Sequence, residues 1–494
     1  MMPKKEHLHI VWLKRDLRLH DNEAIFNALK TKQRILLLYS FEPLLLNDPH
    51  YSERHWNFIK ESLVDINNEL EKYKSKVLVV QSDIIATINQ LQTRYYISDI
   101  FSHQETGILA TYERDKKFKR FCKNNLIQWH QNINNGVLRG LKDREGWSEK
   151  VDTFYAITPL SFQPEQNQLV TIEAINNLEQ NFNIPDLTTP EFTSFQKGGR
   201  STGKRYLKSF FTERYPNYMV HISKPELART SCSRISPYIA WGNVSVREVY
   251  HEAYHLKETS KHKKALEGFM SRLRWQTHFI QKFEMEHTME EASVNKGFHK
   301  LKKSISKRYQ HAWKTGNTGY PLVDACMRCL NETGYLNFRM RALVVSFFTH
   351  NLWQPWQEAT THLSQMFLDF EPGIHFPQLQ MQAGETGINM LRIYNPVKNS
   401  LEHDPDANFI KKWVSELKNL DIPFAHQPYL MTDMEQQFYN FKLGVDYPKP
   451  IVDLEISRKK AGDVLWKLRK DKIVLDESKR ILEKHTLKSR LKNS

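Results

Sequence analysis

Cysteines and long apolar runs are both scarce in this sequence. Only four of its 494 residues are cysteines, which is too few for the disulfide framework of a small secreted domain. No uninterrupted apolar stretch approaches the roughly 20 residues that a membrane-spanning helix needs, and there is no internal repeat or low-complexity segment. We therefore expect a soluble, cytoplasmic protein with reduced thiols and no membrane partner.

Two of the cysteines, Cys326 and Cys329, have the spacing of a redox or metal-binding pair. They lie within "YPLVDACMRCLNETG", whose apolar pattern indicates a helix, and no second Cys or His pair follows nearby. Because structural zinc sites use four such ligands, we interpret the pair as structural and predict no metal site.

Positive charge exceeds negative charge, with a formal net charge of +15. Such an excess favours a polyanionic partner such as nucleic acid. The charge is unevenly placed, because 13 basic and five acidic residues lie between Arg458 and Ser494. This segment would either contact nucleic acid or form a solvated helix or disordered end.

The chain is too long for one ordinary hydrophobic core, and its pattern changes along its length. Residues 1–132 alternate short β-rich runs with amphipathic stretches, which predicts an α/β domain with a parallel, Rossmann-like sheet. Residues 133–198 contain a polar, proline-bearing stretch and are expected to link two domains. Helical periodicity then predicts an all-α domain over 199–450 and a basic helical tail over 451–494.

Three segments of the helical part are chemically unusual. "TSCSRISPYIAWGN", residues 230–243, places small hydroxyl residues and an arginine before a proline suited to a first helical turn. That combination suits a phosphate-binding loop, although an ordinary helix cap with a surface arginine has the same pattern. "FMSRLRWQTHF", residues 269–279, interleaves basic and aromatic residues as a base-stacking groove does, whereas a core tryptophan is the alternative.

The third segment, "YLNFRMRALVVSFFTHNLWQPW" at 335–356, has two arginines in an otherwise apolar helix. A buried arginine needs an acidic partner or a bound anion. Asp369 is the candidate partner of Arg341, and it opens "DFEPGIHFPQLQMQAG", in which one histidine and three glutamines are interleaved with bulky apolar residues.

Four motifs together resemble the photolyase/cryptochrome flavoprotein family. They are "HIVWLKRDLRLHDNEAI" at 9–25, "SRISPYIAWG" at 233–242, "TGYPLVDACMR" at 318–328 and "RIYNP" at 392–396. The resemblance covers essentially the whole chain. It implies an N-terminal antenna domain, a helical FAD-binding domain with non-covalent FAD, and light-driven electron transfer to a pyrimidine dimer flipped out of DNA.

The resemblance also assigns site residues, position by position. Those matching the family's FAD contacts are Tyr218, Cys232, Ser233, Arg234, Ile235, Ser236, Phe269, Arg341, Asp369, Phe370 and Glu371. Those matching its lesion contacts are Arg272, Trp275, Phe338 and Arg339. Those matching its photochemical positions are Trp275, His375 and Trp356. A flavin ring is flat and apolar with a polar rim, so the amide-rich stretch after Asp369 suits its pocket.

Two departures from the family pattern affect electron transfer. His375 stands where repair enzymes of the family have an asparagine facing the flavin N5. Of the family's three electron-carrying tryptophans, Trp356 matches the middle one, but Leu379 and Lys303 occupy the proximal and distal positions. Reduction would then use an external reductant or another aromatic route, for which the candidates are Trp313, Tyr335 and Tyr394.

Two further departures affect lesion recognition. Arg272 replaces a glutamate that hydrogen-bonds a cyclobutane dimer in the family, and Phe338 replaces a neighbouring asparagine. Losing such a buried contact costs on the order of 1–3 kcal/mol. The lesion, cyclobutane or 6-4, therefore stays open. Glu105 lies near the loop that holds a second, antenna chromophore in relatives, with folate, deazaflavin and flavin all open.

Three functions follow. The first is a monomeric deoxyribodipyrimidine photo-lyase-like enzyme that acts on UV-damaged DNA. The second is a cryptochrome-type blue-light photoreceptor without repair activity, which the altered flavin and lesion positions favour. The third is a nucleic-acid-binding flavoprotein without photochemistry.

Overall fold

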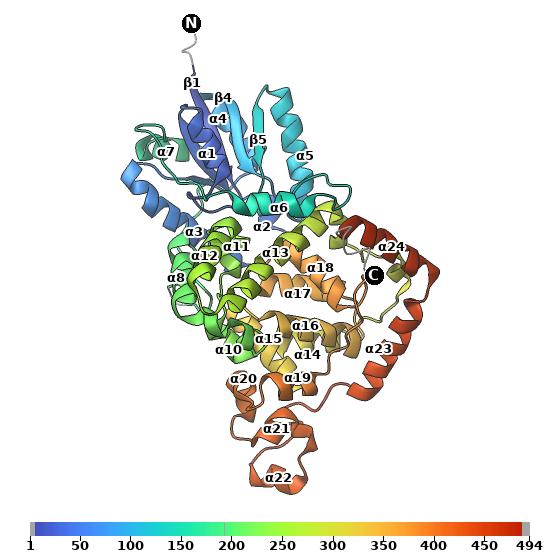
Figure 1. Cartoon of the computed structure of the whole chain (residues 1–494). Coiled ribbons are helices and arrows are strands. Elements are labelled where there is room, and N and C mark those ends of the chain that lie inside the picture. Colours follow the sequence, from blue (N-terminus) through green and yellow to red (C-terminus); the bar gives the residue numbers. More distant parts are fainter. Residues whose placement is uncertain (1–4, 192, 487–494) are drawn as a thin grey trace.

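The N-terminal part of the chain forms an α/β unit, and a larger helical unit lies beneath it (Figure 1). The structure, a computed structural model, describes residues 5–191 and 193–486. The predicted fold class, a parallel sheet domain followed by an all-helical domain, is confirmed.

The sheet has five strands in the order β3-β2-β1-β4-β5, and all neighbours are parallel. The strands are β1 (Glu6–Leu13), β2 (Ile35–Ser40), β3 (Leu78–Val80), β4 (Tyr95–His103) and β5 (Gln128–Asn132). The central strands read as nearly continuous apolar runs because helices cover both faces of a parallel sheet.

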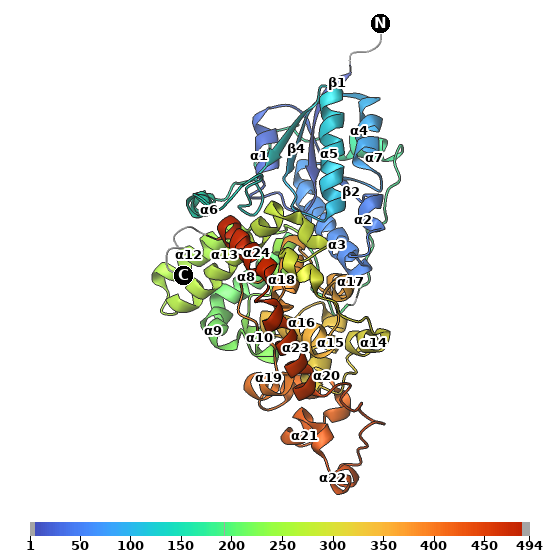
Figure 2. The same ribbon diagram turned by 90° about the vertical axis from the view of Figure 1, so that its right-hand side faces the viewer.

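Alternate residues of β1 point into two different cores, as the pleat requires. Leu8, Ile10 and Trp12 pack with residues of α4 (Ile84–Gln92) and α5 (Leu109–Asn124), whereas Val11 and Leu13 pack with α1 (Glu23–Lys30) and α3 (Glu53–Leu70). Figure 2 shows α1 on one side of the sheet and α4 and α5 on the other. The second of these cores continues into the helical unit and includes Trp356.

The segment predicted as a linker, 133–198, contains two helices. The first, α6 (Trp147–Ala156), packs against α12 (Val246–Thr259) of the helical unit, and the second, α7 (Ile172–Glu179), packs against β3. Ile35 also forms an isolated parallel bridge with Leu169. The segment therefore makes ordered contacts with both units.

The helical unit surrounds the candidate site. Its other α-helices up to residue 438 are α8 (Arg200–Ser209), α9 (Tyr218–His221), α10 (Pro225–Ser231), α11 (Ser236–Ala240), α13 (Lys263–Met285), α14 (Lys307–Thr315), α15 (Pro321–Thr333), α16 (Phe338–Ser346), α17 (Gln357–Met366), α18 (Pro372–Gln382), α19 (Pro396–His403), α20 (Asn408–Trp413), α21 (Ile422–His426) and α22 (Asp433–Phe438). Short helix α2 (Pro43–Leu46) belongs to the sheet unit. Figure 1 shows α21 and α22 at the end of the molecule opposite the sheet.

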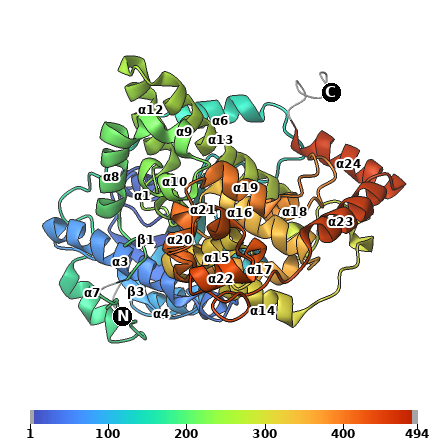
Figure 3. The same ribbon diagram turned by 90° about the horizontal axis from the view of Figure 1, so that it is seen from below.

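The basic C-terminal segment forms α23 (Leu454–Leu468) and α24 (Lys472–His485), which lie on the side of the helical unit away from α8 (Figure 3). They are docked helices, because Val474 and Ile481 are buried and the His485 Nε2 lies 2.6 Å from Glu286 Oε2. Within the described residues, no helix combines the length and apolar character needed to cross a membrane.

Candidate functional site

The predicted phosphate-binding loop connects α10 to α11. Cys232, Ser233 and Ile235 are buried, and α11 begins at Ser236 with a proline in its first turn. Arg234 has φ of +59°, a left-handed conformation that turns the chain sharply between the two helices. The backbone therefore holds these side chains close together at one point of the helical unit.

The Arg234 guanidinium is enclosed without an acidic partner. Its Nη2 donates to Gln196 Oε1 at 2.9 Å, its plane lies 3.8 Å from the ring centre of Tyr335, and its buried Nε makes no hydrogen bond. Burial lowers the pKa of this group. A buried cation of this kind favours a bound anion.

Two further arginines surround the same loop. Arg214 donates to the carbonyl oxygens of Cys232 and Tyr206, and Arg229 donates to the hydroxyl of Thr333. Among the described residues, no carboxylate forms an ion pair with Arg214, Arg229 or Arg234, whose positive charges are therefore uncompensated there. The donor set of three guanidinium groups and nearby hydroxyls fits a pyrophosphate group.

Tyr218 and Phe269 lie next to this loop. The rings of Tyr218 and Phe269 meet edge to face with their centres 5.7 Å apart, and both residues are buried. The Arg272 guanidinium lies beside the Tyr218 hydroxyl, and burial raises the pKa of the tyrosine. The structure thus brings predicted cofactor and lesion residues from α9 and α13 into contact.

The predicted pair of Arg341 and Asp369 is present. Arg341 Nη2 lies 3.0 Å from Asp369 Oδ1 and 2.8 Å from Oδ2, its Nε donates to the Leu336 carbonyl at 2.9 Å, and its guanidinium covers the Phe367 ring at 4.0 Å. These contacts fix the arginine of α16 against the loop that precedes α18. The sequence-based pairing is confirmed.

A cavity lies beside this pair. It is lined by Arg341, Val345, Leu363, Phe367, Asp369, Phe370, Glu371, Ile374, His375, Gln378, Leu379 and Gln382. The residues that α18 contributes recur at intervals of three or four positions and therefore share one face of the helix: Ile374, His375, Gln378, Leu379 and Gln382. A mixture of apolar and neutral polar groups thus faces one space.

Gln380 does not belong to that wall. Its Oε1 accepts from the Val294 backbone N–H at 2.8 Å, and its Nε2 donates to the Met289 carbonyl at 2.8 Å. The alternation of polar and apolar residues makes the three glutamines look equivalent, but the helical period places Gln380 on the opposite face from Gln378 and Gln382. It anchors the 289–294 loop instead.

His375 is neutral in this setting. Its Nε2–H donates to the Thr360 carbonyl at 3.1 Å, which leaves Nδ1 as a hydrogen-bond acceptor. Burial lowers the pKa of His375 to about 3, and the Phe370 ring meets it edge to face at 5.2 Å. The imidazole therefore presents an acceptor rather than a charge.

Phe370 and Glu371 also connect the two units. Arg15, in the loop after β1, donates through Nη2 to the Phe370 carbonyl at 2.5 Å, and the same nitrogen lies 3.5 Å from Glu371 Oε2. The Arg15 guanidinium covers the Trp241 ring at 4.3 Å. Glu371 thus lines the cavity and also pairs with the sheet unit.

The resemblance assigns Trp356, Leu379 and Lys303 to the family's electron-carrying positions, and all three side chains are enclosed. Trp356 is fully buried and donates through Nε1 to Ser293 Oγ at 3.0 Å, while Leu379 is buried on α18. Lys303 is enclosed as well and forms an ion pair with Glu385 at 3.2 Å. The position that the resemblance assigns to the distal tryptophan therefore holds a buried charge pair.

Sequence reasoning missed Trp353, which lies next to Lys303. The Lys303 Nζ is 5.0 Å from the Trp353 ring centre, and Trp353 is partly buried. Its only signal in the sequence is its place three residues before Trp356 in "NLWQPW".

The predicted lesion residues lie at the surface around α9. Trp275 is 43% exposed and Phe338 is 49% exposed, and Arg272 is exposed too. Arg339 Nη2 reaches Ser223 Oγ at 3.5 Å, immediately after α9. Exposed aromatic rings interleaved with guanidinium groups are typical of surfaces on which bases stack.

Cys326 and Cys329 are free and buried in α15, and burial raises the pKa of both thiols, for Cys329 to about 11. The structural interpretation of this pair fits their placement, because thiolates are the reactive and metal-binding form.

Glu105 lies in the sheet unit, where its Oε2 bonds Arg114 Nη2 at 2.6 Å. It borders a cavity at the carboxyl ends of β1 and β2, together with Trp12, Tyr39 and Trp56. In open α/β sheets, ligands bind at such strand ends.

Comparison with known proteins agrees with this geometry. A family model described as DNA photolyase matches residues 9–142, and one described as the FAD binding domain of DNA photolyase matches residues 269–467. A deoxyribodipyrimidine photo-lyase of Alkalihalophilus pseudofirmus is 24% identical over 478 residues, which cover 93% of this chain and 98% of the relative.

Two solved structures share the fold. A Synechocystis cryptochrome has a TM-score of 0.85 at 23% identity and covers 94% of this chain and 100% of its own. An archaeal photolyase from Sulfolobus tokodaii, described with two FAD molecules, has a TM-score of 0.75 at 24% identity, with 93% and 99% covered. The two family models follow one another along the two units described above, and the chain belongs to the DNA photolyase/cryptochrome family.

Proposed function

We propose that this protein is a light-driven DNA repair flavoprotein that splits UV-induced pyrimidine dimers, like a deoxyribodipyrimidine photo-lyase. The observation that carries the proposal is that Arg272 and Trp275, about one turn apart on α13, are both exposed, and that the Arg272 guanidinium lies beside the buried Tyr218. Such a surface offers a stacking ring and hydrogen-bond donors to the two linked bases of a flipped dimer.

FAD is the cofactor that the residues fit. Arg234 and the hydroxyls of Ser233 and Ser236 would hold its pyrophosphate, while Arg341, Asp369 and the wall of α18 would hold its ring. When bound, FAD supplies the light-excited electron that opens the dimer. The chain's own residues bind and orient it, and the apolar wall excludes water from it.

His375 would act on the ring through Nδ1. Because Nε2–H is committed to the Thr360 carbonyl, Nδ1 can accept a hydrogen bond from a ring N–H but cannot donate one. An asparagine can do either by presenting its oxygen or its amide nitrogen. The substitution therefore favours a protonated ring nitrogen over an unprotonated one.

A second chromophore is proposed for the cavity at the carboxyl ends of β1 and β2. The aromatic rings of Trp12, Tyr39 and Trp56 supply apolar surface there, and Lys14 Nζ is buried within ion-pair distance of Asp115 and Glu105. The Sulfolobus tokodaii photolyase, described with two FAD molecules, makes a second flavin one suitable occupant.

A cryptochrome-type photoreceptor without repair activity is the alternative. The altered side chains at His375, Arg272 and Phe338 favour it, and the Synechocystis neighbour is described as a cryptochrome. Repair is favoured because Trp275 exposes a large ring on α13, the helix that also carries exposed Arg272, and an aromatic ring next to a guanidinium suits stacked bases.

Repair assays on defined lesions separate the two functions. The purified, chemically reduced protein is illuminated with blue light in the presence of DNA carrying one cyclobutane dimer or one 6-4 lesion, and restored bases are counted by chromatography. We expect restoration of one lesion in the light and none in the dark. Flavin-loaded protein that restores neither lesion, and binds damaged and undamaged DNA equally, would favour the photoreceptor.

UV-damaged DNA is thus the proposed partner, bound by a monomer in the cytoplasm. The basic residues of α23 and α24 would contact the DNA backbone through charge alone. Changing them should weaken binding to damaged and undamaged DNA equally and reduce its salt dependence.

A further inference from the structure

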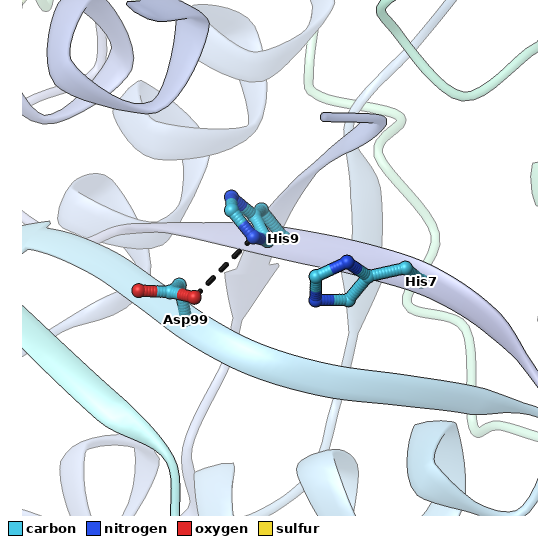
Figure 4. A group of neighbouring side chains, drawn as sticks. All are labelled: His7, His9 and Asp99. Carbon is cyan, nitrogen blue, oxygen red and sulfur yellow. Dashed lines mark ion pairs between the residues drawn. The ribbon is translucent and has the colours of Figure 1, made fainter. Parts of the chain in front are cut away.

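A cluster of histidines and one aspartate lies in the sheet unit, far along β1 from the cavities described above. His7 and His9 are two residues apart on β1, so they share one face of the sheet. Asp99 comes from the neighbouring strand β4 (Figure 4). One ligand atom from each of the three residues lies within 4.8 Å of the others.

An irregularity of β4 aims the aspartate at this face. The register between β1 and β4 shifts between Leu8 and Ile10, so that Ser98 and Asp99 both lie opposite His9. Such bulges re-aim a side chain and are frequent next to functional sites. The irregular pairing opposite His9 therefore places the Asp99 carboxylate on the same side of the sheet as the two histidines.

The hydrogen bonds around His9 fix its protonation pattern. Thr31 Oγ donates its only hydrogen to the Ala28 carbonyl at 2.7 Å, so it accepts from His9 Nδ1 at 3.1 Å. Neutral His9 then carries its hydrogen on Nδ1 and a bare lone pair on Nε2. This is the arrangement of a metal-binding histidine held by an outer hydrogen bond.

That lone pair faces an oxygen with no hydrogen between them. His9 Nε2 lies 3.3 Å from Asp99 Oδ2, and Ser98 Oγ, with one hydrogen, is in contact with Asp99 Oδ2 at 2.5 Å, His7 Nε2 at 2.6 Å and His9 Nε2 at 3.3 Å. Ser98 Oγ donates its one hydrogen to Asp99 Oδ2 and can accept one from His7 Nε2, so neither group supplies a hydrogen to the His9 Nε2 lone pair. A cation between the ring nitrogens and the carboxylate would relieve the repulsion between that lone pair and the Asp99 oxygen.

We propose that His7, His9 and Asp99 form a binding site for a divalent transition-metal ion of the zinc type. Two imidazole nitrogens and one carboxylate oxygen are ligands that zinc accepts at about 2.0–2.2 Å, and imidazole favours it over magnesium or calcium. Small side-chain rotations would bring the three atoms to that distance, and water would complete the tetrahedron.

A fourth side chain orients the carboxylate. His130 Nε2, on β5, bonds Asp99 Oδ1 at 2.7 Å and leaves Oδ2 toward the two β1 histidines. The bound ion would therefore tie β1 to β4 directly and to β5 through His130. Its role would be to hold the start of β1 in the sheet.

Metal binding to the full, flavin-loaded protein tests the proposal. The protein is stripped with a chelator and titrated with Zn²⁺ by calorimetry, and the bound metal is counted by mass spectrometry. We expect one Zn²⁺ per chain, no response to Mg²⁺, and a rise in unfolding temperature with Zn²⁺ concentration. All four cysteines are buried, so thiols do not compete.

Variants make the test specific. His9→Ala and the nearly isosteric Asp99→Asn should lose the bound Zn²⁺, and Thr31→Val should bind it about 10- to 100-fold more weakly because only the outer hydrogen bond is lost. His20→Ala is the matched control, because His20 pairs with Glu69 elsewhere in the same unit. Equal Zn²⁺ binding by the unmodified protein and Asp99→Asn, or no binding at all, would overturn the site.

Discussion

Replacing Arg234 by alanine should separate cofactor affinity from protein stability. In the cofactor-free protein, this guanidinium donates to Gln196 Oε1 at 2.9 Å and to the Arg229 carbonyl at 3.5 Å, and it has no carboxylate partner among the described residues. Alanine loses these hydrogen bonds, worth about 1 kcal/mol each at most, but it also removes a buried, uncompensated charge. The two effects oppose each other, so the stability of the cofactor-free protein should change little.

The cofactor-bound protein should respond strongly. A hydrogen bond between a guanidinium and a pyrophosphate is charge-assisted and contributes about 1.5–3 kcal/mol. Its loss should raise the Kd for FAD by roughly 10- to 150-fold, and the thermal stabilisation that FAD confers should shrink accordingly. Arg234→Lys should recover part of the affinity because it keeps the charge but not the planar fork.

Fluorescence titration of free FAD and thermal unfolding with and without FAD measure both quantities. Arg205→Ala is the control, because Arg205 is an exposed arginine of α8. An unchanged Kd in a folded Arg234→Ala protein would refute the assignment of this loop to the pyrophosphate.

Three other predictions concern the lesion surface, flavin photoreduction and the docking of α24. Trp275→Ala should weaken binding to damaged DNA by about 1–3 kcal/mol and leave undamaged duplex unaffected, as measured by fluorescence anisotropy. Trp356→Phe should slow flavin photoreduction only modestly if tyrosines carry a bypass, and Tyr335→Phe or Tyr394→Phe should then slow it further in absorbance kinetics. Burial opposes ionisation of Glu286, but His485, Lys484 and Arg480 lower its pKa to about 2. Because this folded-state pKa lies below the unfolded value of 4.5, the Glu286 carboxylate should stabilise the docking of α24 fully above pH 4.5 and lose that effect as the pH falls toward 2.

Each of these has a distinct contradictory outcome. Equal losses for both kinds of DNA would remove Trp275 from the lesion site. Complete loss of photoreduction in Trp356→Phe, with no effect of either tyrosine variant, would exclude the bypass. If the Glu286→Gln variant and the unmodified protein have the same midpoint pH of acid unfolding, then other contacts hold α24.

The sequence by itself predicted much of the architecture and one pair of the site. Strand and helix periodicities are local, so the alternation of strands and helices up to residue 132 and the helical character after residue 198 follow from short windows. Arg341 and Asp369 were matched because an arginine in an apolar helix needs a compensating anion wherever the chain folds. The loop around Arg234 was identified from motif resemblance, since its residues are consecutive.

Only the tertiary structure decided which groups share a space. The sequence pattern groups Gln380 with Gln378 and Gln382, but the helical period places Gln380 on another face of α18, where it accepts a hydrogen bond from the Val294 backbone N–H. Lys303 and Trp353 are 50 residues apart in the chain, and their contact depends on how separate segments pack.

The His7, His9 and Asp99 cluster shows the same division most clearly. The His-x-His spacing on a strand is visible in the sequence, but the aspartate lies 90 residues further on. It reaches His9 only because β4 pairs with β1 and shifts register opposite that residue. Pairing between distant strands is set by the packing of the whole sheet against its helices, and no local pattern of residues specifies it.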